Sequence, residues 1–159
     1  MDNRLSLLSV RHSQDMHSFE FRDPAKLINE IAQRVPLAED TAYVALVAHP
    51  STEQRLVTVR QLSTPALIDD YEEAIDELGD VMESLEIPGA TRPPSHSVIT
   101  IVVRPGLCVF GPNEGCWMSA WRYSNHFRDC YDGGVVLVTE HGWSDFMNES
   151  AWCSPAMAA

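Results

Sequence analysis

The sequence predicts one domain of mixed α/β (α+β) class, in which a mixed β-sheet with a hairpin is packed by about three main helices. The length of 159 residues suits a single core, and the apolar share of 45% is that of a globular chain. Helical apolar stripes also alternate with short apolar runs typical of strands. We place the domain at residues 23–152, after a weakly ordered segment at 1–22 and before a flexible tail at 153–159.

The first part of the chain indicates a strand, a helix and a hairpin. Residues 18–22 alternate between aromatic and polar side chains, which indicates a short edge strand. Asp23 is a suitable cap for a helix over 24–35, whose apolar residues share one face. The apolar run 43–47 and the alternating run 56–61 are joined by a short loop, which predicts an antiparallel pair.

The clearest helical pattern covers residues 66–86. Thr64 is its expected cap and Pro65 its expected first residue. Apolar residues recur there at steps of three and four, which gives one buried stripe.

The second half continues the alternation of strands and helices. The apolar run 98–103 predicts a central strand buried on both faces, and 107–110 a short further strand. A third helix is expected over 113–127, followed by a strand over 134–139. Residues 143–150 suggest a short closing helix.

Composition narrows the classes of partner. The net charge of −12 opposes binding to nucleic acid or to an anionic membrane. No apolar run approaches the length of a membrane span, so we expect a cytoplasmic protein. Arginine supplies the cations almost alone, with Lys26 the only lysine, which suggests a GC-rich bacterium such as an actinobacterium, or its phage. Four cysteines without a Cys-x-x-Cys spacing are expected to be reduced thiols.

The polar face of the 66–86 pattern is acidic throughout, and no lysine or arginine occurs between Gln61 and Thr91. One interpretation is a solvated surface. Another is a docking surface for a protein with a basic patch, and the binding of divalent cations is a third. The residues that we assign to partner binding are Asp69, Glu73, Asp76, Glu77 and Asp80.

The segment 139–145 follows an apolar strand, which is where α/β proteins often carry chemistry. Glu140, His141, Ser144 and Asp145 are the candidate catalytic residues, since they supply an acid, a base and a nucleophile. Their spacing matches no known nucleophile motif, so an ordinary polar loop is the competing interpretation.

Two other groups of residues carry weaker signals. His49, His96 and His141 are scattered and form no metal-binding spacing, so we expect neither a metal nor another cofactor. Trp117 and Trp121 lie one helical turn apart, which indicates core packing or a dimer seam.

The order of elements between Tyr43 and Phe146 resembles that of the RadC/JAB metalloprotease-like family, and more loosely the deaminase fold. The resemblance covers about two-thirds of the chain and concerns topology alone. In that family a His-x-His-Pro ligand segment follows the central strand, whereas Val103-Arg104-Pro105-Gly106 stands here. Pro112 and Cys116 do not match the deaminase Pro-Cys-x-x-Cys either. The resemblance therefore implies a relative without the metal.

These observations favour a non-enzymatic binding or regulatory module that docks a basic protein partner through the acidic helix, with a homodimer as a further expectation. The alternative is a small hydrolase or transferase that uses the candidate residues of segment 139–145.

Overall fold

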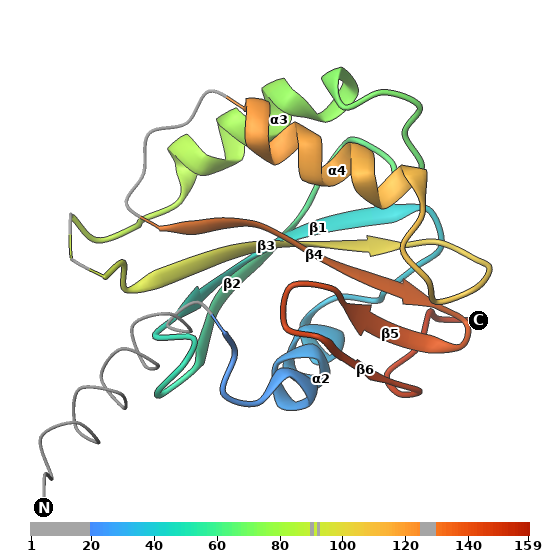
Figure 1. Ribbon diagram of the computed structural model, residues 1–159, viewed down its shortest axis with the longest axis horizontal. Coiled ribbons are helices and arrows are strands. Elements are labelled where there is room, and N and C mark those ends of the chain that lie inside the picture. Colours follow the sequence, from blue (N-terminus) through green and yellow to red (C-terminus); the bar gives the residue numbers. More distant parts are fainter. Residues whose placement is uncertain (1–19, 90, 92, 125–129) are drawn as a thin grey trace, which may run out of the picture.

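The computed structural model describes residues 20–89, 91, 93–124 and 130–159. Its centre is a mixed six-stranded sheet in the order β2-β1-β3-β4-β5-β6, which confirms the predicted fold class (Figure 1). β3 and β4 are parallel, and every other neighbouring pair is antiparallel. The strands are β1 (Thr41–Ala48), β2 (Arg55–Gln61), β3 (His96–Val103), β4 (Tyr131–Thr139), β5 (Gly142–Asp145) and β6 (Ser150–Trp152).

Helices cover both faces of the central strands. α3 (Glu72–Ser84) and α4 (Pro112–Tyr123) lie on one face, and α2 (Pro24–Arg34) lies on the other (Figure 1). Each face has its own apolar cluster, the first around Leu78 and Trp117 and the second around Ile31. All eight residues of β3 are buried as a result, as its continuous apolar run predicts.

The predicted helix over 66–86 begins later than its cap signal indicates. α3 starts at Glu72, and residues 62–71 form a loop. Backbone N–H groups of this loop are bonded by side chains from other elements instead of by helical carbonyls. The N–H of Leu67 donates to Asp40 Oδ1 over 3.1 Å, and that of Ile68 donates to Asn113 Oδ1 over 2.9 Å. These distant acceptors replace the first helical turn.

Two further predictions are wrong. Residues 107–110 form a loop, because the guanidinium of Arg104 holds the carbonyls of Leu107 and Val109. Residues 143–150, expected as a helix, contribute to the β5–β6 hairpin. Gly142 starts that hairpin at φ +122, where a Cβ would lie 2.1 Å from the carbonyl oxygen of Trp152. Only glycine fits this close approach.

Both ends of the described chain contact the folded domain. The expected strand at 18–22 is not formed at residues 20–22, and residues 18 and 19 lie outside the described part. Phe21 is nevertheless buried against the α2 side of the sheet. In the segment predicted as a flexible tail, the N–H of Met157 donates to Thr139 and that of Ala158 to Leu37. The third helix ends at Tyr123, and residues 125–129 lie outside the described part.

Candidate functional site

Glu140 and His141 lie in the tight turn between β4 and β5, and both are exposed. Their side chains pair with each other, with His141 Nε2 3.6 Å from Glu140 Oε1. Glu140 Oε2 also accepts the N–H of Gly106 over 2.9 Å. Backbone hydrogen bonds, from its own N–H and from Gly106, lower the pKa of Glu140. An exposed acid with a lowered pKa is a weak proton donor at neutral pH.

Ser144 and Asp145 follow each other on β5, so their side chains point to opposite faces of the sheet. Asp145 pairs in register with Val136, which belongs to the cluster on the α2 side. Ser144 Oγ lies 3.6 Å from the sulfur of Cys108. The structure thus gives the hydroxyl and the carboxylate separate neighbours, and it assembles no acid, base and nucleophile from the four candidates.

Asp145 organises the loop that follows it. Its Oδ1 accepts the N–H groups of Met147 and Asn148 over 3.1 and 3.3 Å. Its Oδ2 accepts Asn148 Nδ2 over 2.7 Å. Burial raises the pKa of Asp145 to about 6, even though the bonds from Asn148 and Met147 favour the charged form. These hydrogen bonds account for the turn that joins β5 to β6.

The raised pKa of Asp145 predicts a specific pH dependence of stability. The folded chain binds the proton of the Asp145 carboxyl more tightly than the unfolded chain does. The stability that this protonated carboxyl contributes is therefore complete below a pH of about 4 and is lost as the pH rises through 6. The difference in pKa corresponds to about 3 kcal/mol. In urea titrations from pH 4 to pH 8, Asp145→Asn should gain stability relative to wild type by roughly this amount. Glu53→Gln, which neutralises an exposed carboxylate outside this turn and outside α3, controls for the general effect of removing one charge. A curve for Asp145→Asn parallel to that of wild type, or an equal gain for Glu53→Gln, would refute the assignment.

A buried ion pair that the sequence does not reveal fixes the loop after β3. The side chain of Glu114 is fully buried and accepts Arg104 Nε over 2.9 Å and Arg104 Nη2 over 2.6 Å. It also accepts the N–H of Gly111 and the amide of Asn113. Burial alone would raise the pKa of Glu114, but the bonds from Arg104, Asn113 and Gly111 lower it. Glu114 is therefore a charged anchor for the start of α4.

Arg104 stands where the RadC/JAB resemblance expects metal ligands. Its guanidinium already neutralises Glu114, and Val103 and Pro105 on either side offer no ligand side chain. Nowhere in the described residues do three or more His, Cys, Asp or Glu side chains gather as a metal site would require. The residues present at this place do not fit a divalent cation.

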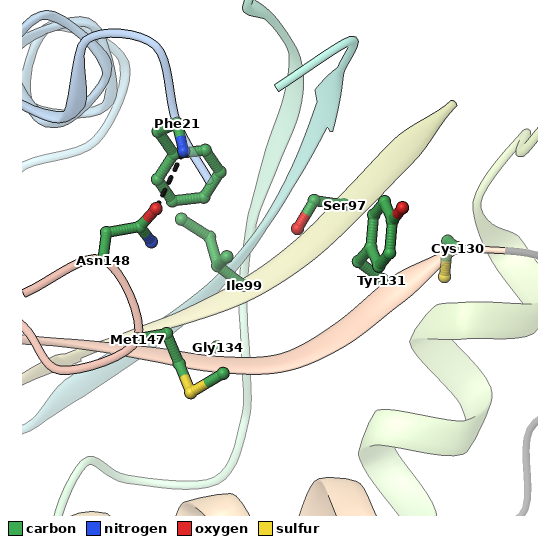
Figure 2. Close-up of a pocket in the computed structure, with 8 residues that line it drawn as sticks. All are labelled: Phe21, Ser97, Ile99, Cys130, Tyr131, Gly134, Met147 and Asn148. Carbon is green, nitrogen blue, oxygen red and sulfur yellow. Dashed lines mark hydrogen bonds between the residues drawn. The ribbon is translucent and has the colours of Figure 1, made fainter. Parts of the chain in front are cut away.

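A pocket of about 260 Å³ opens on the α2 side, between Phe21 and the first residues of β4 (Figure 2). Phe21, Ile99 and Met147 form one part of its wall, and Ser97 and Tyr131 lie farther along (Figure 2). The N–H of Phe21 donates to Asn148 Oδ1 over 2.8 Å. Among the described residues no Asp, Glu, Lys, Arg or His lines this pocket, and Cys130 and Tyr131 are its ionisable side chains.

The five acidic residues assigned to partner binding divide into two groups. Glu73 and Glu77 bond the loop 62–71, and this structural role was not predicted. Glu73 Oε2 accepts the N–H of Asp69 over 2.7 Å. Glu77 accepts the N–H groups of Ser63 and Thr64 over 2.6 and 2.7 Å. Burial would raise the pKa of Glu77, but these backbone bonds lower it.

The other three, Asp69, Asp76 and Asp80, are exposed. Asp76 and Asp80 follow Glu72 at steps of four, so they form a single stripe along α3. Within the described part of the chain, no ion pair neutralises this stripe. At one end of the stripe, the rings of Tyr71 and Tyr123 lie 5.2 Å apart, and Tyr123 is exposed.

Trp117 and Trp121 belong to the core and not to a surface. Both are buried in the cluster under α3 and α4. Trp117 Nε1 donates to the carbonyl of Ala66 over 2.9 Å, and Trp121 Nε1 donates to Thr100 Oγ1 over 2.6 Å. Core packing, one of the two interpretations of their spacing, is correct.

Comparison of the chain with protein-family models, curated proteins and solved structures found no match. Among the described residues, none of the helices combines the length and apolarity needed to cross a membrane.

Proposed function

We propose that the protein is a non-enzymatic binding module that docks a protein with a basic surface on the outward stripe of α3. The observation that supports this most is the exposure of Glu72, Asp76 and Asp80, none of which forms an ion pair within the described residues. Arg60 bonds Ser84, one helical turn beyond Asp80, and makes no ion pair with the stripe. Like charges four residues apart destabilise an isolated helix by a few tenths of a kcal/mol per pair. A basic partner would relieve that repulsion.

The surroundings of the stripe suit a protein partner. Leu67 in the loop before α3 and Tyr123 at the end of α4 are both exposed, and the ring of Tyr123 contacts that of Tyr71, which precedes α3. Protein interfaces are enriched in aromatic side chains at their centre and carry polar groups at their rim, so Tyr123 and the acidic stripe suit these two parts. Glu73 and Glu77 hold the loop in place, so they serve this surface by positioning it.

Glu140 and His141 pair with each other, but Ser144 and Asp145 have other neighbours, and this division supports a binding role over the alternative of a hydrolase or transferase. The structure joins none of the four cysteines in a disulfide, which suits the reducing cytoplasm that we propose as the location.

A matched pair of charge reversals tests the proposal. Wild-type protein immobilised on a resin captures candidate partners from a lysate of the source organism, and each candidate is then purified. The double variant Asp76→Lys with Asp80→Lys should bind the purified partner at least about tenfold more weakly than wild type. The affinity of this variant should also depend less on salt concentration. Glu30→Lys with Glu53→Lys, one in α2 and one beside its start, makes the same change in net charge on the α2 side of the sheet. Equal weakening by both pairs, or none by the first, would contradict the proposal.

A further inference from the structure

An apolar groove of about 470 Å³ lies between the loop after β3 and the β5–β6 hairpin. Val109, Phe110, Phe146 and Ala151 line it, and the rings of Phe110 and Phe146 lie 5.5 Å apart. Val109 is 66% exposed and Phe146 is 62% exposed. Apolar surface of this kind, gathered in a hollow, is typical of a binding site.

The charged residues of the groove have one sign. The acidic residues Asp145 and Glu149 are the charged residues among the described ones that line it. Asp145 is buried and bonded within its own turn, so the exposed Glu149 supplies the charge that an occupant would meet. The occupant that fits best therefore combines apolar side chains with cations.

The described chain begins beside this groove. The N–H of Phe21 is bonded to Asn148 (Figure 2). Asn148 Nδ2 in turn donates to Asp145 Oδ2 over 2.7 Å. Glu149, the next residue, lines the groove. The residues before Phe21 are thus tethered a short distance from it, which gives them a high effective concentration there.

One stretch of that tethered segment has the required chemistry. Residues 4–11, Arg-Leu-Ser-Leu-Leu-Ser-Val-Arg, place four apolar side chains between two arginines and contain no carboxylate. In a chain with a net charge of −12, this composition is unusual. We propose that residues 4–11 dock in the groove, with their apolar side chains against Phe110 and Phe146 and an arginine toward Glu149. This inference is independent of the proposed role of α3.

Disulfide trapping in the full chain tests the docking, because Cys108 lines the groove. Leu8→Cys is introduced together with Cys153→Ser, which removes the exposed native thiol. Under mild oxidation, the introduced cysteine should form an intramolecular disulfide with Cys108, located by peptide mass spectrometry. The matched control Ser13→Cys lies on the same tether outside residues 4–11, and it should react at least about tenfold more slowly.

Charge-reversal variants and amide hydrogen exchange test the docking of residues 4–11 in two further ways. Adding Arg4→Glu and Arg11→Glu to the Leu8→Cys chain should slow trapping about tenfold. Without any new cysteine, Leu7→Ser with Leu8→Ser should accelerate amide exchange at residues 107–110, while the thermal unfolding midpoint confirms an intact fold. Equal trapping rates for both positions, unchanged exchange, or disulfides formed mainly between chains would each overturn the proposal. The last result would assign the groove to a second copy.

Discussion

Replacing Arg104 with alanine is expected to lower the free energy of unfolding by about 3–5 kcal/mol. The side chain of Glu114 is fully buried, and Arg104 is its only cationic partner among the described residues. Removing the guanidinium leaves a buried carboxylate whose remaining donors are the N–H of Gly111 and the amide of Asn113. The loop after β3 also loses the bonds to Leu107 and Val109. Urea unfolding at pH 7 measures the effect.

Two further variants separate the lost charge from simple truncation. In the double variant Arg104→Met with Glu114→Gln no uncompensated charge remains, so it should be more stable than Arg104→Ala. Lys26→Ala removes an exposed pair in which Lys26 Nζ lies 4.0 Å from Glu30. That control should change stability by less than about 1 kcal/mol. If Arg104→Ala also lowered the free energy of unfolding by less than about 1 kcal/mol, burial of Glu114 would not require the guanidinium of Arg104.

Trp117→Ala is expected to destabilise the chain by about 3–5 kcal/mol. The indole is fully buried in the cluster with Leu78 and Met82, and its removal leaves a large cavity. The carbonyl of Ala66 also loses the hydrogen bond from Trp117 Nε1, so the loop before α3 becomes less well fixed. Thermal unfolding followed by circular dichroism measures the loss.

Conservative and exposed substitutions give the controls for this experiment. Trp117→Phe keeps most of the packing but not the hydrogen bond, and it should lose less stability than Trp117→Ala. Tyr123→Ala on the same helix removes a ring that is 58% exposed, so its effect should be much smaller. Comparable losses for Trp117→Ala and Tyr123→Ala would contradict a core role for the indole.

Elements with a local signal were predictable from the sequence. The β1–β2 hairpin and the buried β3 follow from alternating and continuous apolar runs over residues close in the chain. The start of α3 does not, because Asp40 and Asn113, both far away in sequence, bond the residues that precede it. A threonine followed by a proline is a good start signal for a helix, but these tertiary bonds outweigh it.

The candidate site shows the same division between local pattern and tertiary contact. The exposure of Asp76 and Asp80 follows from helical periodicity. The roles of Glu73 and Glu77 as acceptors for a loop do not, since only the folded loop brings backbone N–H groups to them. Similarly, no motif announces the pair of Arg104 and Glu114, whose ten-residue separation matches no regular helix or strand spacing.

The order of strands in the sheet also bears on synthesis. β1 and β2 are close in sequence and can pair as a hairpin as soon as both have been translated. The other edge of β1 pairs with β3, and residues 49–95 separate β1 from β3 in sequence. Until β3 emerges, the nascent chain presents an apolar strand with unpaired backbone groups. The acidic stretch that contains α3 is translated during this interval, so its like charge is expected to oppose association of neighbouring nascent chains before β3 pairs with β1.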